Sequence, residues 1–163
     1  MSESFEYREV THFATGSLGE PGNRTFFLQV GNDHGYISVK LEKQQVEALA
    51  QFLTSILEDL PATPQSTEIF ELKEPAVIEW VVGQIAVGVD ESDGEIVLLV
   101  EERPESADET LVDDGAQLRA HITTLQAAQF VKTAQRAIKG GRPPCRLCGQ
   151  PMDPSGHTCP RLN

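Results

Sequence analysis

The chain has 163 residues, of which 39% are hydrophobic and 23% charged, as is typical of a globular protein. At this length folding buries roughly 70% of the unfolded surface, so one hydrophobic core can stabilise the fold. The formal net charge of −12 argues against a general binder of nucleic acids or anionic membranes, because phosphates would be repelled. No apolar run reaches the about 18 residues of a membrane helix, and the acidic start lacks the apolar stretch of a signal peptide. We therefore expect a cytoplasmic protein.

The first half of the chain has the pattern of several strands followed by one helix. A short strand is expected at 5–13, a loop rich in turn residues at 15–23, and a hairpin with strands at 24–30 and 36–41. A helix is predicted over 42–60, because its apolar residues recur at steps of three and four. These residues are Val46, Leu49, Ala50, Leu53, Ile56, Leu57 and Leu60.

The second half begins with another group of strands. They are expected at 76–90, 96–102 and 116–122, and the turn residues of 91–94 join the first two. The acidic stretch 101–114 is interpreted as an exposed loop, because solvation alone accounts for its charge.

A second amphipathic helix is predicted over 124–139. Thr123 caps it, and Gln126 stands three residues further on, as in a capping box. A shift of 81 residues superimposes the patterns of the two halves, which leaves a structural repeat and a chance likeness as open interpretations. The residues that coincide are Leu41 with Ile122, Gln45 with Gln126, Leu49 with Phe130 and Leu57 with Ile138.

These patterns predict an α+β fold with a mostly antiparallel sheet of about six strands and two amphipathic helices, in a β-β-β-α order that would occur twice. The domain is expected to cover 1–140. Gly140 and Gly141 end the last helix, and a small zinc-binding segment is expected at 141–163.

The C-terminal segment carries four residues that favour a metal site. Cys145 and Cys148 stand three apart before a glycine, and His157 and Cys159 stand two apart. Three thiolates and one imidazole match one tetrahedral structural zinc ion, Zn²⁺. Redox chemistry of the two nearby cysteines and a catalytic zinc are the alternatives, although four protein ligands would leave no position for water.

Three stretches of this chain resemble a known family. The letters GSLGEPGNRTFFLQV, LEKQQVEALA and CRLCGQPMDPSGHTCPR together resemble the actinobacterial family of uncharacterised proteins called domain of unknown function 3090. The resemblance implies a bacterial cytoplasmic protein without an established reaction. It also implies protein partners, such as a histidine-phosphatase-like or a kinase-like protein, whose genes tend to lie nearby together with a mycothiol-biosynthesis ligase.

The loop that precedes the first hairpin is the candidate ligand or partner site of the main domain. Gly16, Gly19 and Gly22 recur at steps of three ahead of Arg24. Glycine-rich phosphate loops usually lead into a helix N-terminus, whereas this loop leads into a strand. A long hairpin turn and an anion or partner site at Arg24 are the two interpretations, and any pocket of the main domain is expected here.

Other candidate residues have structural interpretations. His34 is expected in a solvated turn, while His12 and His121 are expected on strands, and nothing in the sequence brings the three together. Trp80 stands in an apolar strand and is predicted to lie in the core.

The sequence lacks a nucleophile elbow, a Walker loop and a kinase-type lysine set, so an enzyme is not the leading hypothesis. The leading hypothesis is an interaction or adaptor protein with a structural zinc site. The alternative is an enzyme or sensor for a phosphorylated or thiol-sugar metabolite that uses the loop 16–24. Binding of nucleic acid through the basic tail is a weaker third hypothesis.

Overall fold

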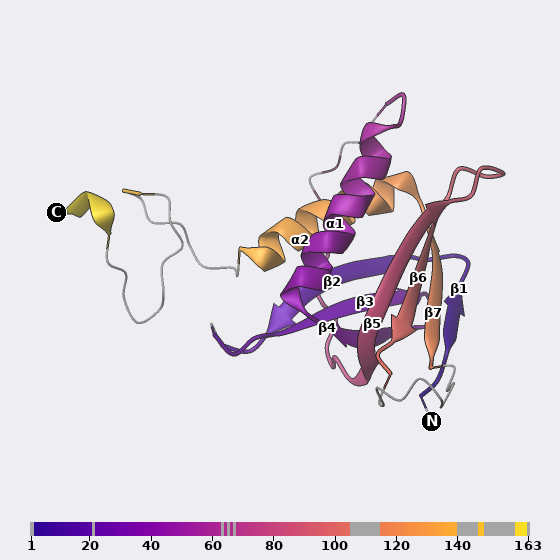
Figure 1. The fold of residues 1–163 in the computed structure, drawn as a ribbon, viewed down its shortest axis with the longest axis horizontal. Coiled ribbons are helices and arrows are strands. Elements are labelled where there is room, and N and C mark those ends of the chain that lie inside the picture. Colours follow the sequence, from indigo (N-terminus) through magenta and orange to yellow (C-terminus); the bar gives the residue numbers. More distant parts are fainter. Residues whose placement is uncertain are drawn as a thin grey trace.

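The computed structural model describes residues 2–20, 22–62, 64, 66, 68–104, 115–139, 147–148 and 159–162. It confirms an α+β fold with two helices and a mostly antiparallel sheet (Figure 1). The first five elements are β1 Phe5–Tyr7, β2 His12–Leu18, β3 Thr25–Asn32, β4 Gly35–Leu41 and α1 Lys43–Glu58. The others are β5 Ile78–Val89, β6 Ile96–Glu102, β7 Gln117–Ile122, α2 Thr124–Ile138 and the short 3-10 helix Pro160–Leu162.

The described strands form one sheet of seven rather than about six, in the order β1-β7-β6-β5-β4-β3-β2. The pairs β1–β7 and β4–β5 are parallel and the other pairs are antiparallel. The two edge strands β1 and β2 are separated in the chain by residues 8–11 alone. Because so few residues join the two edges, the sheet curls and brings them toward each other. The backbone N–H of Thr11 donates to the carbonyl of Gly31 at 3.0 Å and extends the pairing of β2 with β3.

This curling corrects two sequence predictions. The predicted strand 5–13 is wrong as one element, because residues 5–7 pair with β7 whereas the chain from residue 12 pairs with β3. The predicted loop 15–23 begins too early, because residues 15–18 continue β2. Pairing with β3 satisfies their backbone groups and overrides the turn preference of a Thr-Gly-Ser sequence.

The element order consists of two consecutive units of three strands and one helix. We call β2, β3, β4 and α1 the first unit, and β5, β6, β7 and α2 the second unit. Both helices begin with a capping box. The backbone N–H of Glu42 donates to the side-chain oxygen of Gln45 at 2.7 Å, and the N–H of Thr123 donates in the same way to Gln126 at 2.9 Å. The predicted cap at Thr123 is confirmed, and its hydroxyl accepts from the N–H of Gln126 at 3.1 Å.

Both helices lie on the same face of the sheet and share one core with it (Figure 1). The rings of Phe13 on β2 and Phe130 on α2 stack at 4.3 Å between centroids. Trp80 is buried, as predicted, and its indole N–H donates to the carbonyl of Glu3 at 2.9 Å. Alternate residues of each strand point to the opposite face of the sheet, which we call the outer face. None of the helices in the described part of the chain is long and apolar enough to cross a membrane.

Candidate functional site

The candidate loop of the sequence lies at the end of the edge strand β2. Gly16 is part of β2, and the turn that follows uses Gly19 and Gly22, whose φ angles of 109° and 88° favour glycine. Arg24 precedes β3. The loop thus serves as a hairpin turn, and it also forms one wall of a cavity.

A second wall comes from residues 68–75, which we call the strap. The strap passes along α2, where the N–H of Phe70 donates to the hydroxyl of Thr133 at 3.3 Å. It then turns around the edge strand β2 and crosses the outer face of the first unit. There Leu72 lies so close to Gly16 that a Cβ atom on that glycine would be 2.9 Å from Leu72 Cγ. No pattern in the sequence had indicated residues 68–75 as part of the site.

Gln29 holds the strap against the sheet. Its buried side-chain amide donates to the carbonyl of Lys73 and accepts from the N–H of the same residue, both at 2.8 Å. It also donates to the hydroxyl of Ser38 at 3.1 Å. Since the amide oxygen of Gln29 only accepts, the Nε2 of His12, 3.0 Å away, carries the proton in this contact.

The environment of His12 favours its neutral form. Burial lowers the pKa of His12, the hydrogen bond to Gln29 opposes this, and the charge of Lys73 lowers the pKa further. Further along the strap, the hydroxyl of Tyr36 donates to the carbonyl of Pro75 at 2.8 Å. The strap is therefore fixed at three successive points on the outer face of the first unit.

The cavity between β2, the strap and the C-terminal half of α2 has a volume of about 390 Å³. Gly16, Gly19 and Arg24 line it, as expected from the sequence, whereas Gly22 does not. Ser17 and Leu18 of the same loop also line it. The walls that the sequence did not predict comprise Thr15, the strap residues Ile69, Phe70, Glu71, Leu72 and Glu74, and Thr133, Arg136 and Ala137 of α2.

Arg24 is a cation of this cavity that is held by several contacts. Its Nη1 donates to the hydroxyl of Ser17 at 3.2 Å and to the carbonyl of Ala137 at 3.4 Å. Its guanidinium carbon lies 5.3 Å from the centroid of the Phe26 ring. No carboxylate pairs with Arg24 among the ion pairs of the described residues. The guanidinium thus caps the C-terminal end of α2, where the helix dipole favours a positive charge.

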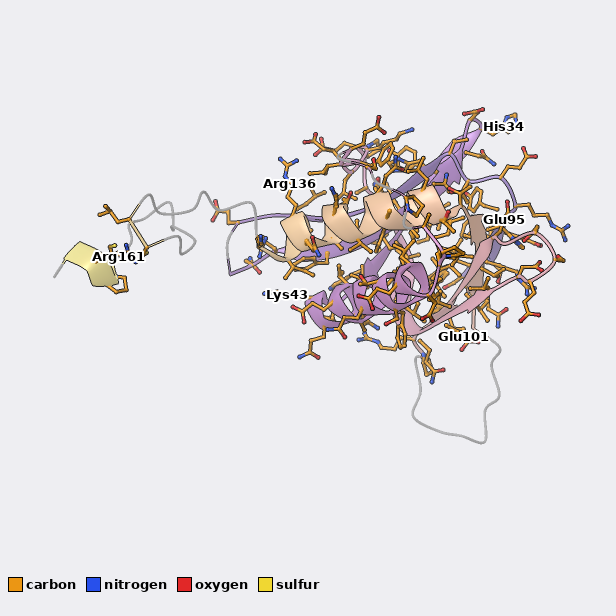
Figure 2. All side chains as sticks on the ribbon, turned by 90° about the horizontal axis from the view of Figure 1, so that it is seen from above. His34, Lys43, Glu95, Glu101, Arg136 and Arg161 are labelled. Atoms are coloured by element: carbon orange, nitrogen blue, oxygen red, sulfur yellow. The ribbon has the colours of Figure 1, made fainter. Side chains whose placement is uncertain are left out.

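The other cation of the cavity lies at its rim. Arg136 extends from the outer surface of α2 (Figure 2) and forms an ion pair with Glu71 at 3.9 Å. The two side chains are 59% and 80% exposed, so this pair contributes little to stability. Histidine, cysteine and lysine are absent from the lining, and the hydroxyl of Thr133 already donates to the carbonyl of Gln129 at 2.9 Å. Among the described contacts, the hydroxyls of Thr15, Ser17 and Thr133 are bonded to backbone carbonyls or to Arg24 and not to a carboxylate.

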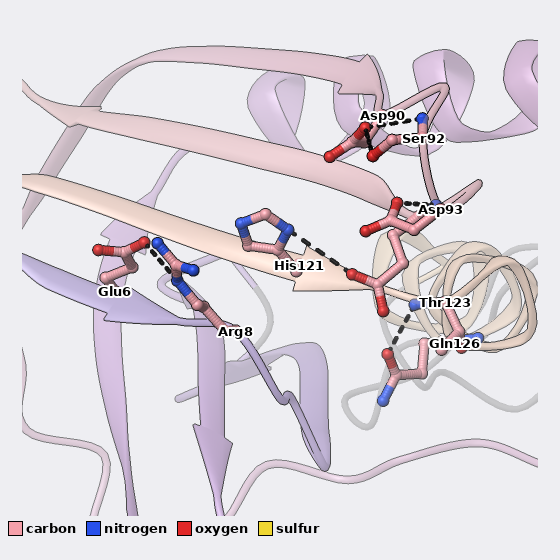
Figure 3. A network of polar contacts seen from close by, with 9 residues as sticks. Glu6, Arg8, Asp90, Ser92, Asp93, His121, Thr123 and Gln126 are labelled. Atoms are coloured by element: carbon pink, nitrogen blue, oxygen red, sulfur yellow. Dashed lines mark hydrogen bonds and ion pairs between the residues drawn. The ribbon is translucent and has the colours of Figure 1, made fainter.

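The remaining histidines of the described residues lie elsewhere. His34 is exposed in the turn between β3 and β4, as predicted. His121 on β7 points toward the turn that precedes β6 (Figure 3), where its Nδ1 lies 3.6 Å from Oε2 of Glu95. In the same turn the hydroxyl and the N–H of Ser92 donate to Asp90 and lower the pKa of its carboxyl. These contacts shape an exposed turn.

Two of the four predicted zinc ligands lie outside the described residues. Cys145 and His157 are not described, while Cys148 is half-buried and Cys159 is buried. Among the described residues no group of three or more histidine, cysteine, aspartate or glutamate side chains could hold a metal ion. The zinc site therefore stays a prediction.

The fold and the cavity define a small α+β domain of two β-β-β-α units with a surface pocket at the edge of the first unit. A model of the family DUF3090, described as a protein of unknown function, matches residues 5–159. The chain belongs to this family. No curated protein and no solved structure matches the chain.

Proposed function

We propose that the protein is a non-catalytic binding protein that recognises a small anionic molecule, such as a phosphorylated or thiol-sugar metabolite, in the cavity beside Arg24. The observation that carries this proposal is the guanidinium of Arg24, which is held in place at the wall of a cavity without a carboxylate partner among the described residues. The volume of about 390 Å³ falls within the range of roughly 300–1,000 Å³ that is usual for small-molecule sites.

Two further features support recognition of an acidic group. The described hydrogen bonds of Arg24 use Nη1 alone, so Nε and Nη2 can donate to a phosphate or carboxylate. The contacts with Ser17, Ala137 and the ring of Phe26 order the side chain in advance, which lowers the entropic cost of binding. The lining contains hydroxyls and carboxylates, but no described hydrogen bond joins one of its hydroxyls to a carboxylate or a histidine, which supports a sensor or carrier in preference to an enzyme.

A thermal-shift screen tests the proposal. Inorganic phosphate, a hexose phosphate and a thiol sugar would be added to the intact protein, to Arg24→Ala and to Arg24→Lys. A ligand at 100 times its Kd stabilises the folded state by about 2.7 kcal/mol, which raises Tm by several degrees. We expect this rise to vanish in Arg24→Ala. Arg119→Ala, which removes an exposed arginine on β7, serves as the control and should keep it. An equal rise in all the proteins would exclude Arg24 as the recognition residue.

We also propose that Cys145, Cys148, His157 and Cys159 bind one structural Zn²⁺ and that the segment they hold docks a protein partner. The spacing of these four residues supports the metal, and their number would complete its coordination. Elemental analysis should return one zinc per chain, lost when Cys148 and Cys159 are both changed to serine. Chelation should expose the segment 143–163 to proteolysis while the main domain stays resistant, because metal binding would supply most of the folding free energy of so short a segment. Protein without bound metal would refute this proposal.

A further inference from the structure

The two units correspond residue by residue in their strand register. In the first unit Ala14 pairs with Gln29, and Gln29 with Ser38. In the second unit Ala86 pairs with Leu99, and Leu99 with Arg119, which lies 81 residues after Ser38. The same register makes Gly88 the counterpart of Gly16 and Val89 the counterpart of Ser17. The shift of 81 residues makes Phe52 on α1 the counterpart of Thr133 on α2.

The strand edges correspond as well. Residues 12–18 of β2 pair with β3 and form an edge of the sheet, around which the strap turns. In β5, only Ile78 and Val81 pair with β4, while residues 84–89 pair with β6 on one side. The end of β5 is therefore an edge like that of β2.

The strap covers these positions in the first unit. Ala14 is fully buried, Leu72 packs on Gly16, and Gln29 is bonded to the backbone of Lys73. Thr133 is buried and accepts a hydrogen bond from the strap.

No described residue covers the counterparts in the second unit. A Cβ atom on Gly88 would meet nothing within 4 Å, and Ala86 is exposed. Phe52 is 57% and Val89 is 48% exposed, and Leu99 is half-buried. We call Phe52, Gly88, Val89 and Leu99 the open surface.

Three pairs of corresponding positions differ in polarity in the direction opposite to what solvent exposure predicts, whereas the pair of the buried Ser38 and the exposed Arg119 follows it. Residues that face water are normally more polar than their buried equivalents. Here the buried Thr133 and Gln29 and the half-buried Ser17 of the first unit correspond to the apolar Phe52, Leu99 and Val89 on the open surface. Val89 and Leu99 lie on opposite faces of the sheet beside the edge of β5, so a segment that turns around this edge could contact both.

We propose that the open surface binds an extended, leucine-bearing segment of a partner protein, which runs along α1 and around the edge of β5 as the strap runs along α2 and around β2. The strap shows the geometry that such a unit accepts. Leu99 stands where the first unit has Gln29, so the open surface offers no side-chain amide to the backbone of the partner segment. Apolar contacts hold the segment instead, and one of its leucines packs over Gly88 as Leu72 packs over Gly16. This inference does not depend on the ligand proposed for the cavity.

A segment of this chain is the less suitable occupant. The run Ile69-Phe70-Glu71-Leu72 supplies the large apolar residues of the strap, and it is already bound to the first unit. The chain after α2 contains no such run, since Leu147, Met152 and Leu162 are its only large aliphatic residues and stand apart in the sequence. The same reasoning applies to the strap of a second copy.

A synthetic peptide with the sequence of residues 68–77 serves as the probe, with a fluorophore at its N-terminus and photo-leucine in place of Leu72. Its binding to the intact protein would be measured by fluorescence anisotropy, and its crosslinks would be mapped by mass spectrometry. We expect saturable binding and crosslinks beside Gly88. Gly88→Leu fills the position of the incoming leucine in open space and should weaken binding at least tenfold. Leu99→Gln should weaken it in the same direction, while Leu125→Asp, at an exposed apolar residue of α2 outside this surface, should leave it unchanged.

Three results would overturn the proposal. The first is the absence of peptide binding, or binding that Gly88→Leu and Leu99→Gln leave intact. The second is a crosslink from photo-leucine at position 99 of the intact protein to residues 140–163 of the same chain, which would make the tail the occupant. The third is a dimer in light scattering that Gly88→Leu dissociates, which would make a second copy the occupant.

Discussion

Replacement of Gln29 by leucine tests how the strap is held and therefore how the cavity wall is built. The side chain is fully buried and makes four hydrogen bonds, two to the backbone of Lys73 and one each to Ser38 and His12. Leucine has a similar volume and no polar atoms, and it is the residue at the equivalent position 99. The substitution leaves the four partner groups without their bond.

The expected loss follows from these contacts. Each net hydrogen bond contributes about 1 kcal/mol, and a buried group left without a partner costs about 1–3 kcal/mol. Burial of the leucine offsets part of this, and release of the strap into water can rehydrate its backbone. We therefore expect Gln29→Leu to lower the free energy of unfolding by about 2–4 kcal/mol.

Urea denaturation followed by circular dichroism would measure the loss, and hydrogen exchange would report the amide of Lys73 separately. We expect that amide to lose its protection first, because the strap is released before the domain unfolds. Leu99→Gln is the matched control and should change stability by less than about 1 kcal/mol, because its side chain reaches water. A loss of less than about 1 kcal/mol in Gln29→Leu, or equal losses in the two variants, would refute the assigned role of Gln29.

Three further predictions concern packing, pH and helix capping. Gly16→Ala should destabilise the protein by about 1 kcal/mol, because the added Cβ atom displaces Leu72 of the strap. Gly88→Ala should be neutral or stabilising, because its Cβ atom meets no other atom. Equal effects of the two substitutions on the free energy of unfolding in urea would contradict this prediction. Because the pKa of His12 is lower in the folded state, the unfolded state takes up the proton at a higher pH than the folded state does. The free energy of unfolding should therefore fall as the pH drops below the ordinary histidine value of 6.5, by at most about 1.4 kcal/mol per pH unit. It should stop falling once the pH is below the pKa of His12 in the folded protein. A stability profile that His12→Gln leaves unchanged would assign the dependence to another group. Thr123→Ala should cost about 1 kcal/mol in the same melts, and an unchanged midpoint would show that the hydroxyl cap is dispensable.

The elements that the sequence predicted best are those whose signals are local. The helix predicted over 42–60 is observed as α1 Lys43–Glu58, and the helix predicted over 124–139 as α2 Thr124–Ile138. The periodicity of apolar residues and a capping box are complete within a few turns of chain, so no distant partner is needed to recognise them. The strand β6 was likewise predicted with its observed bounds, because turn residues delimit an apolar run.

The loop that the sequence singled out contributes part of a cavity lining, while its role as a site stays a prediction. Gly16 and Arg24 do line a cavity, but its other walls come from α2 and from a linker in which no periodic pattern was recognised. The apolar residues Ile69, Phe70 and Leu72 are unusual for a solvated connection, and they are the sequence feature that could have indicated a packed linker. Leu72 packs against Gly16, more than 50 residues away in the chain, and Phe70 is bonded to Thr133, and no local pattern records such distant partners.

The sequence alone therefore determined where the helices lie, how they begin, and which segment carries the cysteines and histidine of the predicted metal site. The tertiary structure alone decided that residues 5–13 split between two edges of one curled sheet and that Gln29 binds a strap. It also decided that the strap covers one unit, while no described residue covers the corresponding positions of the other. The physical reason is that helix periodicity and capping are properties of neighbouring residues, whereas strand pairing and coverage of a sheet depend on which distant segments satisfy the same backbone and apolar groups.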